Sequence, residues 1–243
     1  MREKTLRSAR SLVVLLALLL PEVAHAYDFD ACTDSLDPAA AVEGCTATLQ
    51  KHWANPAQVA MILNNRGSAH VLLGEFDKAI DDFDRAIDLD PDYARAHYNR
   101  ASAHLGKLDY QSATADLSKA IHLKQDYMEA LHNRGFVHEK LGLYTDAIAD
   151  FSKVIAINPH LSLAFNNRGV AYKKSGQLHR AISDFNDALR LTPDNIRALL
   201  NRAETFELAH LHDDAIADYR QVLGIDAANE RASKGLSRLS SAK

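Results

Sequence analysis

The sequence predicts an all-α solenoid in which short helical hairpins stack in a row. The dipeptide Asn-Arg recurs at residues 65, 99, 133, 167 and 201, so a period of 34 residues is kept without an insertion. Apolar residues between these points follow the three-four spacing of helix faces. Aromatic residues make up only 7% of the chain, and Ala and Leu are abundant, which favours helix over sheet. A helical period of this length is typical of stacked supersecondary units.

The first 26 residues have the pattern of a secretory signal peptide. Basic residues up to Arg10 precede an apolar run from Leu12 to Leu20, and Ala24-His25-Ala26 provides a small-x-small cleavage pattern. A helix of this run rises only about 14 Å, roughly half of a ~30 Å hydrocarbon core, so we do not expect a membrane span. The alternative is a hydrophobic tail that is not cleaved. We expect cleavage after Ala26 and a periplasmic or secreted mature protein.

Residues 27–59 are predicted to cap the amino end with half a repeat. Projected back by one period, Cys45 falls on the position of Ala79 and Leu49 on that of Phe83. The segment from Pro38 to Trp53 therefore reads as a lone second helix, with Asp37 as N-cap and Pro at the first helical position.

The only two cysteines, Cys32 and Cys45, both lie in this segment. An even number of cysteines in an exported chain favours a Cys32–Cys45 disulfide. The alternatives are two buried free thiols or a redox pair, although the C-x-x-C spacing of redox pairs is missing.

One period, residues 60–93, contains two helices. The first ends at Leu73-Gly74, because Gly tolerates the left-handed conformation of a helix end. The second runs from Phe76 and stops at Asp90-Pro91. The same pattern gives five repeats and a capping helix, at residues 60–93, 94–127, 128–161, 162–195, 196–229 and 230–243.

Small and charged residues recur at fixed positions in every repeat. We expect Gly67 and Ala79 to face each other where the two helices approach closely, since a bulky residue there would cost roughly 1–3 kcal/mol. Each repeat also pairs the Arg of Asn-Arg with an Asp 16 residues later. These are predicted to form five ion pairs that bridge the two helices of a repeat or adjacent repeats, at Arg66/Asp82, Arg100/Asp116, Arg134/Asp150, Arg168/Asp184 and Arg202/Asp218. The alternative is two solvated faces with no contact.

The pattern resembles the tetratricopeptide repeat (TPR) family. The resemblance covers residues 60–229 and rests on the period, the small residue of the first helix, the Ala of the second helix and the closing Pro. It implies a right-handed superhelical solenoid. The first-helix aromatic of the family is replaced by His70, His104 and His138 in the first three repeats.

No motif for catalysis, a cofactor or nucleic acid is found. The chain lacks a nucleophile elbow, a phosphate-binding loop and H-E-x-x-H, and its formal charge of −4 argues against nucleic-acid binding. His70, His104 and His138 lie a repeat apart, roughly 10 Å by helix-packing distances, which is too far for one metal ion. We predict no enzyme activity, no cofactor and no metal.

The Asn of each Asn-Arg pair is the best functional candidate. In the resembled family the first helix lines the concave surface, and a primary amide can pair with either group of an extended peptide backbone. The alternative is that these amides hydrogen-bond the neighbouring repeat, and both can hold. The predicted peptide-binding groove comprises Asn65, Asn99, Asn133, Asn167 and Asn201, with Tyr98, His132, Phe136, Asn166 and Val170 beside them.

The predicted function is that of an exported scaffold or adaptor that binds a protein or peptide segment in this groove. The groove lacks the Lys/Arg set with which some members of the resembled family clamp a terminal carboxylate. The alternative function is a self-assembling structural repeat protein of the cell envelope.

Overall fold

The computed structural model describes residue 32 and residues 36–50 and 55–241. The predicted signal peptide, residues 1–26, lies outside the described residues. Within the described part of the chain, the structure has twelve α-helices and no strand, so the all-α fold class is confirmed. The chain divides into two compact units, residues 1–130 and 131–243, which are described separately.

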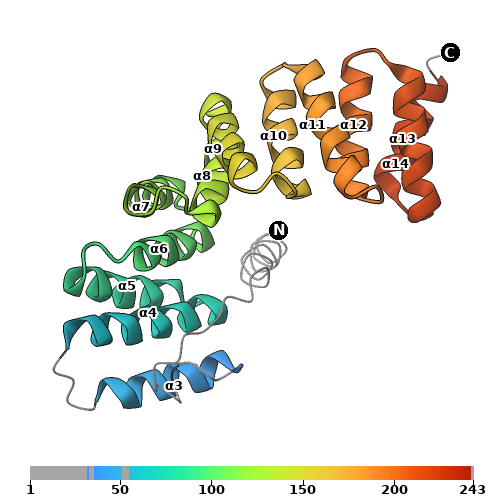
Figure 1. Ribbon diagram of the computed structural model, residues 1–243. Helices are drawn as coiled ribbons and strands as arrows, with labels where there is room; N and C mark the ends of the chain where they lie inside the picture. Colours follow the sequence, from blue (N-terminus) through green and yellow to red (C-terminus); the bar gives the residue numbers. More distant parts are fainter. Residues whose placement is uncertain (1–31, 33–35, 51–54, 242–243) are drawn as a thin grey trace. The chain divides into compact units, whose positions relative to one another are not determined.

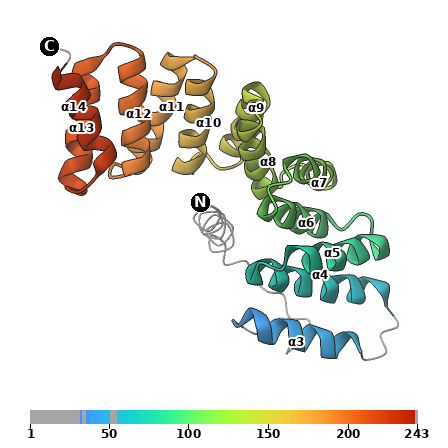
Figure 2. The same cartoon turned by 180° about the vertical axis from the view of Figure 1, so that it is seen from behind.

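In the first unit each helix packs against the next one along the chain (Figures 1 and 2). Helices α4 and α6, which are the first helices of successive repeats, also contact each other. The unit therefore has the layered arrangement of a helical-repeat protein. Its helices are α3 (Pro38–Leu49), α4 (Pro56–Leu73), α5 (Phe76–Leu89), α6 (Ala94–Gly106) and α7 (Tyr110–Leu123).

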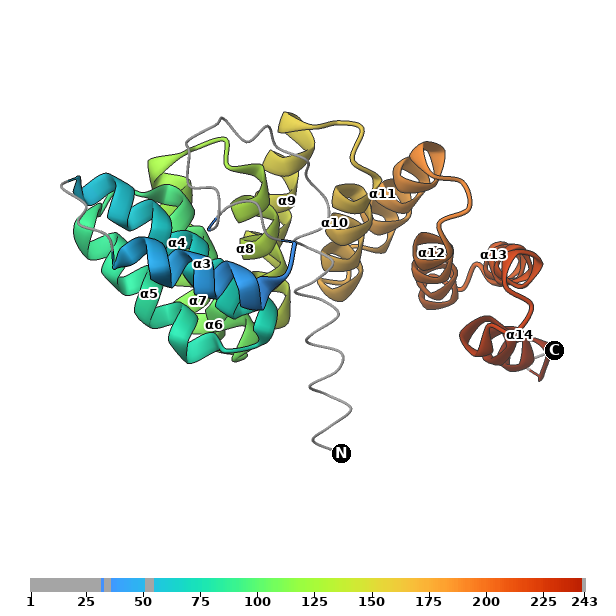
Figure 3. The ribbon, with the colours of Figure 1, turned by 90° about the horizontal axis from the view of Figure 1, so that it is seen from below.

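The second unit continues the pattern, with α10 against α12 as successive first helices and α14 packed on α13 (Figure 3). Most of α8 belongs to this unit. The helices are α8 (Met128–Lys140), α9 (Tyr144–Ile157), α10 (Ser162–Lys174), α11 (Leu178–Leu191), α12 (Ile196–Leu208), α13 (His212–Ile225) and α14 (Glu230–Ser241).

The turn between the two helices of a repeat needs a left-handed residue. Gly74 ends α4 with φ 75°, as the sequence predicted, and Gly142 and Gly176 occupy the same position one period apart. At this position the other two repeats carry Leu108 with φ 63° and His210 with φ 58°. Because a side chain in this conformation crowds the backbone, these two turns are strained relative to the glycine turns.

The two helices of a repeat meet where a small residue faces a ring. A Cβ added to Gly67 would lie 2.8 Å from Cε1 of Phe83, and Gly135 and Gly169 stand in the same relation to Phe151 and Phe185. The nearest atoms to Gly67 therefore belong to Phe83, not to Ala79 as the sequence led us to expect. Ala79 is itself fully buried.

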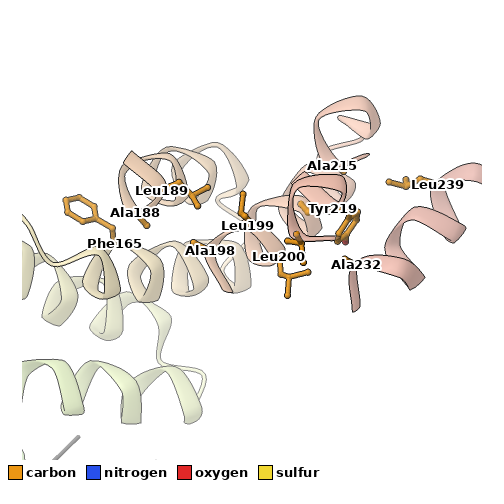
Figure 4. Packing of buried hydrophobic residues seen from close by; sticks show 12 residues of the cluster. Phe165, Ala188, Leu189, Ala198, Leu199, Leu200, Ala215, Tyr219, Ala232 and Leu239 are labelled. Carbon is orange, nitrogen blue, oxygen red and sulfur yellow. The ribbon is translucent and has the colours of Figure 1, made fainter. Parts of the chain in front are cut away.

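The last helices share one apolar cluster, part of which is shown in Figure 4. The ring of Tyr219 is fully buried there, and Leu239 of α14 is 5% exposed. Leu236 packs against the same cluster. The apolar side of α14 thus covers the end of the second unit.

At the other end, the predicted disulfide between Cys32 and Cys45 is confirmed. Cys45 lies on α3 and packs with Ile62 of α4. Asp37 caps α3, and its carboxylate accepts from the N–H of Ala39 at 3.1 Å. Among the described residues, no helix combines the length and the apolar character that crossing a bilayer requires.

Candidate peptide-binding surface

The five Asn residues of the Asn-Arg pairs, here called the asparagine row, lie on the first helices of the repeats. Asn65 and Asn99 belong to the first unit, on α4 and α6, and the other three belong to the second unit. Asn65, Asn99 and Asn167 are half-buried, whereas Asn133 and Asn201 are buried. The row is therefore not equally accessible along its length.

In the first unit the side-chain amides form a short chain of hydrogen bonds, in which each amide donates to the next one. Asn99 donates through Nδ2 to Oδ1 of Asn64 at 2.8 Å and to Oγ of Ser68 at 3.1 Å. Asn64 in turn donates through its own Nδ2 to Oδ1 of Asn65 at 3.3 Å. Asn64 is 1% exposed, so these bonds form largely away from water. They link α6 to α4 and give every carboxamide in the chain a fixed orientation.

In the second unit a longer chain runs in the same direction. Asn201 donates to Oδ1 of Asn166 at 3.0 Å, and Asn166 donates to Oδ1 of Asn167 at 3.2 Å. The amide of Asn167 lies 2.9 Å from Nε2 of His132, whose ring is also hydrogen-bonded to Asn133. Interactions between neighbouring repeats, the alternative considered for the asparagine row, are therefore present at Asn99, Asn167 and Asn201.

His132 takes part in this chain of hydrogen bonds as a neutral ring. Burial lowers its pKa below the ordinary value of 6.5, because the charged ring would lose its hydration. Its Nε2 can then accept from the Asn167 amide, and the edge of its ring meets Phe151 with centroids 5.7 Å apart. Protonation of Nε2 would place two donors against each other.

Aromatic side chains flank the asparagine row in both units. In the first unit the rings of Tyr98 and Tyr127 are 5.0 Å apart, and Nζ of Lys124 lies 4.8 Å from the Tyr127 centroid. In the second unit Lys140 lies 4.9 Å from the centroid of Phe136. Val170 on α10 is half-buried.

Sequence reasoning did not single out Tyr127 or Asn64. Tyr127 shares a repeat position with Tyr93, and this was the available signal for it. Asn64 shares a position with Tyr98, His132, Asn166 and Leu200, so no residue type repeats there to draw attention to it.

The charges near the row in the second unit are paired. Lys173 bonds Glu204 at 2.9 Å, and Glu204 also accepts from Arg231 of α14 at 2.6 Å. Lys174 pairs with Glu139. These lysines are engaged by carboxylates of the same unit and do not form an open cationic clamp.

The five predicted Arg–Asp pairs are all confirmed. In each, Nε and Nη2 of the Arg contact the two carboxylate oxygens of the Asp, as in Arg168–Asp184 at 2.8 Å each. In four of the pairs, those of Arg66, Arg100, Arg168 and Arg202, Nη1 also reaches back to the second helix of the preceding repeat, as from Arg168 to Ser152 at 3.0 Å. One Arg thus fastens three helices, which fixes the repeat register. The other pairs are Arg66–Asp82, Arg100–Asp116, Arg134–Asp150 and Arg202–Asp218.

In the first three repeats a histidine also lies close to the Asp of the Arg–Asp pair. Nδ1 of His138 lies 3.1 Å from Oδ2 of Asp150, and His70 and His104 approach Asp82 and Asp116 at 3.9 and 3.8 Å. The sequence placed these rings at the interior aromatic position but did not indicate the carboxylate contact.

The histidine changes the ionisation of the aspartate. Burial alone would raise the pKa of Asp150, but the close approach of His138 and the hydrogen bonds from Arg134 outweigh it and hold that pKa below its ordinary value. In the fourth repeat Tyr172 stands in place of the histidine. There burial dominates and raises the pKa of Asp184 in spite of Arg168.

No three His, Cys, Asp or Glu side chains are gathered as a metal site requires, as far as the described residues go. The chemistry that this surface offers is that of oriented amides, aromatic rings and paired charges, which is the chemistry of recognition.

The stacked helical hairpins, small-residue contacts and repeated polar row define a helical-repeat solenoid. Family profiles described as tetratricopeptide or TPR repeats match residues 67–107, 129–161 and 166–230. The chain belongs to the tetratricopeptide repeat family.

Solved structures with the same fold support this assignment. YrrB, described as a TPR protein with an unusual peptide-binding site, aligns with a TM-score of 0.70 at 19% identity, over 81% of this chain and 99% of YrrB. MamA residues 41 to the end from Desulfovibrio magneticus RS-1 align at 0.67 and 20% identity, over 70% of this chain and 97% of that one. Another MamA structure is 26% identical, with a TM-score of 0.61 over 69% of this chain and 96% of that one. Among curated proteins, no match was found.

Proposed function

We propose that this protein is a non-enzymatic scaffold that binds an extended segment of a partner protein along the asparagine row. The observation that carries the proposal is the orientation of the row by hydrogen bonds, with Asn65, Asn99 and Asn167 still half-buried rather than sealed. A carboxamide held in one orientation loses little conformational freedom when a peptide binds, so a larger part of the hydrogen-bond energy appears as affinity.

The aromatic residues beside the row supply contact area of a kind that favours peptide recognition. Tyr98, which directly precedes Asn99, pairs its ring with that of Tyr127, and tyrosine is enriched in protein interfaces because it joins apolar area to a polar tip. Backbone contacts from the amides would give general affinity, and these rings would select side chains. The peptide-binding site described for YrrB, which has the same fold, is consistent with this role.

We further propose that the chain acts outside the cytoplasm. The leader pattern of residues 1–26 and the disulfide between Cys32 and Cys45 both favour an oxidising compartment. The intact mass of the protein purified from the envelope or medium is expected to correspond to a chain that begins at Tyr27. A mass that retains residues 1–26 would contradict export by cleavage.

Selection from a random library of dodecapeptides tests the binding function. The full mature chain is expected to select peptides that bind with a measurable Kd by fluorescence anisotropy. Combined replacement of Asn99, Asn133 and Asn167 by Ala is expected to weaken binding by at least tenfold. The matched control is Gln111→Ala, which removes an exposed amide from the second helix α7.

Two results would reject the proposal. One is a selection that yields no binding peptide, and the other is a triple variant that binds as tightly as Gln111→Ala. Light scattering of the unliganded protein addresses the rival function, since a mass that rises with concentration would favour self-assembly instead.

A further inference from the structure

The two hydrogen-bond chains along the asparagine row differ at their ends. In the second unit both ends are closed. Nη2 of Arg231 lies 3.5 Å from Oδ1 of Asn201 at one end, and at the other end His132 is bonded to Asn133, which is only 3% exposed. Each amide between them is engaged on both its donor and its acceptor side. This chain joins α12, α10 and α8 and ties them to the capping helix α14.

In the first unit one end is an acceptor. Both hydrogens of the Asn99 amide are used, one toward Oδ1 of Asn64 and one toward Oγ of Ser68. Because a carboxamide is planar and its oxygen lies opposite its NH2 group, Oδ1 of Asn99 is directed away from α4. Within the described residues this oxygen accepts no hydrogen bond.

The other end of the same chain is a donor. Oδ1 of Asn65 is occupied by the amide of Asn64, which leaves the NH2 group of Asn65 with two hydrogens and no acceptor in the described part of the chain. Hydrogen bonds in series polarise one another, so a terminal donor and a terminal acceptor in one chain are each strengthened. The first unit therefore presents one strong donor and one strong acceptor on neighbouring first helices.

A peptide main chain offers the complementary pair of groups. We propose that Asn65 and Asn99 are the residues that hold the bound main chain, with Asn65 donating to a peptide carbonyl and Asn99 accepting from a peptide N–H. The hydrogen-bond chain that contains Asn167 and Asn201 instead holds the repeats of the second unit together. This inference rests on the proposed function and assigns unequal roles to a row that looks uniform in sequence.

The spacing of the two groups sets the register of the peptide. Neighbouring packed helices lie roughly 8–10 Å apart. An extended chain advances about 3.3 Å per residue. The carbonyl bound by Asn65 and the N–H bound by Asn99 therefore belong to residues about three apart. The ring pair of Tyr98 and Tyr127 adjoins the Asn99 end, so a peptide side chain near the bound N–H meets aromatic surface.

The replacement Asn65→Asp isolates the donor. Aspartate has the same shape, and it still accepts the bond from Asn64, but it has no hydrogens for a peptide carbonyl. With a dodecapeptide selected on the wild-type chain as the probe, Asn65→Asp is expected to weaken binding at least tenfold without lowering the thermal midpoint. The counterpart Asn201→Asp loses its donation to Asn166 and is expected to lower the midpoint, with a smaller loss of affinity at equal folded fraction.

The acceptor is tested on the peptide instead of the protein. Each backbone N–H of the probe is methylated in turn, and one position is expected to cost at least tenfold in affinity through loss of its bond to Asn99. In Asn99→Ala the same methyl group should cost less than twofold, while the penalties at other positions stay as they were.

The outcomes separate this inference from the proposed function. A library that yields no binder rejects the function. A binder that is unaffected by Asn65→Asp, or an N-methyl penalty that persists unchanged in Asn99→Ala, overturns the assignment of Asn65 and Asn99 while leaving peptide binding in place.

Discussion

Replacement of Gly135 by Ala is expected to overpack the contact between α8 and α9. The added Cβ would lie 2.9 Å from Cε1 of Phe151 and 3.1 Å from Cδ1 and Cζ. Carbon atoms in favourable contact are about 3.5–4.0 Å apart, so the ring would have to move by roughly 0.6–1 Å. Phe151 is 1% exposed, and a shift of this kind in a close-packed interior costs about 1–3 kcal/mol.

A double-mutant cycle separates this cost from the helix propensity of alanine. Gly→Ala within a helix is favourable by about 1 kcal/mol, which partly hides the steric cost in the single variant. Phe151→Leu removes the ring and reproduces the combination of Ala101 and Leu117 found in the repeat at 94–127. Since the propensity gain occurs in both backgrounds, it cancels, and the coupling free energy should equal the steric cost of about 1–3 kcal/mol.

Urea unfolding of the four chains, followed by circular dichroism, measures this coupling. The combined variant should be more stable than the sum of the two single effects predicts. Additivity within about 0.5 kcal/mol would show that the ring of Phe151 moves freely, and the account of the close approach would then be wrong.

Three other measurements test separate parts of the structure. Leu108→Gly should raise the free energy of unfolding by about 1 kcal/mol, because glycine relieves the strain of the left-handed turn. Gly142→Leu, at the same repeat position, should lower the free energy of unfolding. Effects of the same sign in both variants would contradict the account of turn strain. The pKa of His132 lies below 6.5 in the folded protein, so the unfolded protein binds the proton of this side chain more strongly, and the free energy of unfolding should fall as the pH drops through 6.5. His132→Asn should show a smaller fall with pH. Identical pH profiles of the two proteins would refute the neutral-ring assignment. Cys45→Ser opens a bridge with a sequence separation of 13 and should cost about 3 kcal/mol in unfolding experiments, whereas an unchanged urea midpoint would show that α3 does not depend on the bridge.

The sequence predicted those parts of the fold that recur. The period set the positions of both helices in each repeat, and the Arg–Asp spacing of 16 residues is the same five times. When two residue types recur at the same spacing in every repeat, their contact can be predicted without knowing the side-chain rotamers. The left-handed turn at Gly74 was predictable for the same reason, because the local chemistry alone dictates it.

Contacts that depend on three-dimensional side-chain placement were not predictable in this way. The neighbour of Gly67 is Phe83, four residues beyond the expected Ala79, because the ring extends from its own turn of helix to cover the gap. The approach of His138 to Asp150 was also missed. In the first three repeats an imidazole stands where the family pattern has an aromatic ring, and its second role follows only when the buried carboxylate is seen beside it.

The hydrogen bonds of the asparagine row depend on a repeat position at which the residue type varies. The acceptors for Asn99, Asn167 and Asn201 all come from the residue 35 positions earlier, which is Asn64, His132 or Asn166. In each case this variable residue passes the hydrogen-bond chain to the Asn that follows it, and these Asn residues differ in exposure. Asn64 passes the chain to Asn65 and leaves it open, while His132 passes it to Asn133, which is buried. If the proposed function holds, such a scaffold can keep its fold while the residues around the row set where a partner's main chain is held.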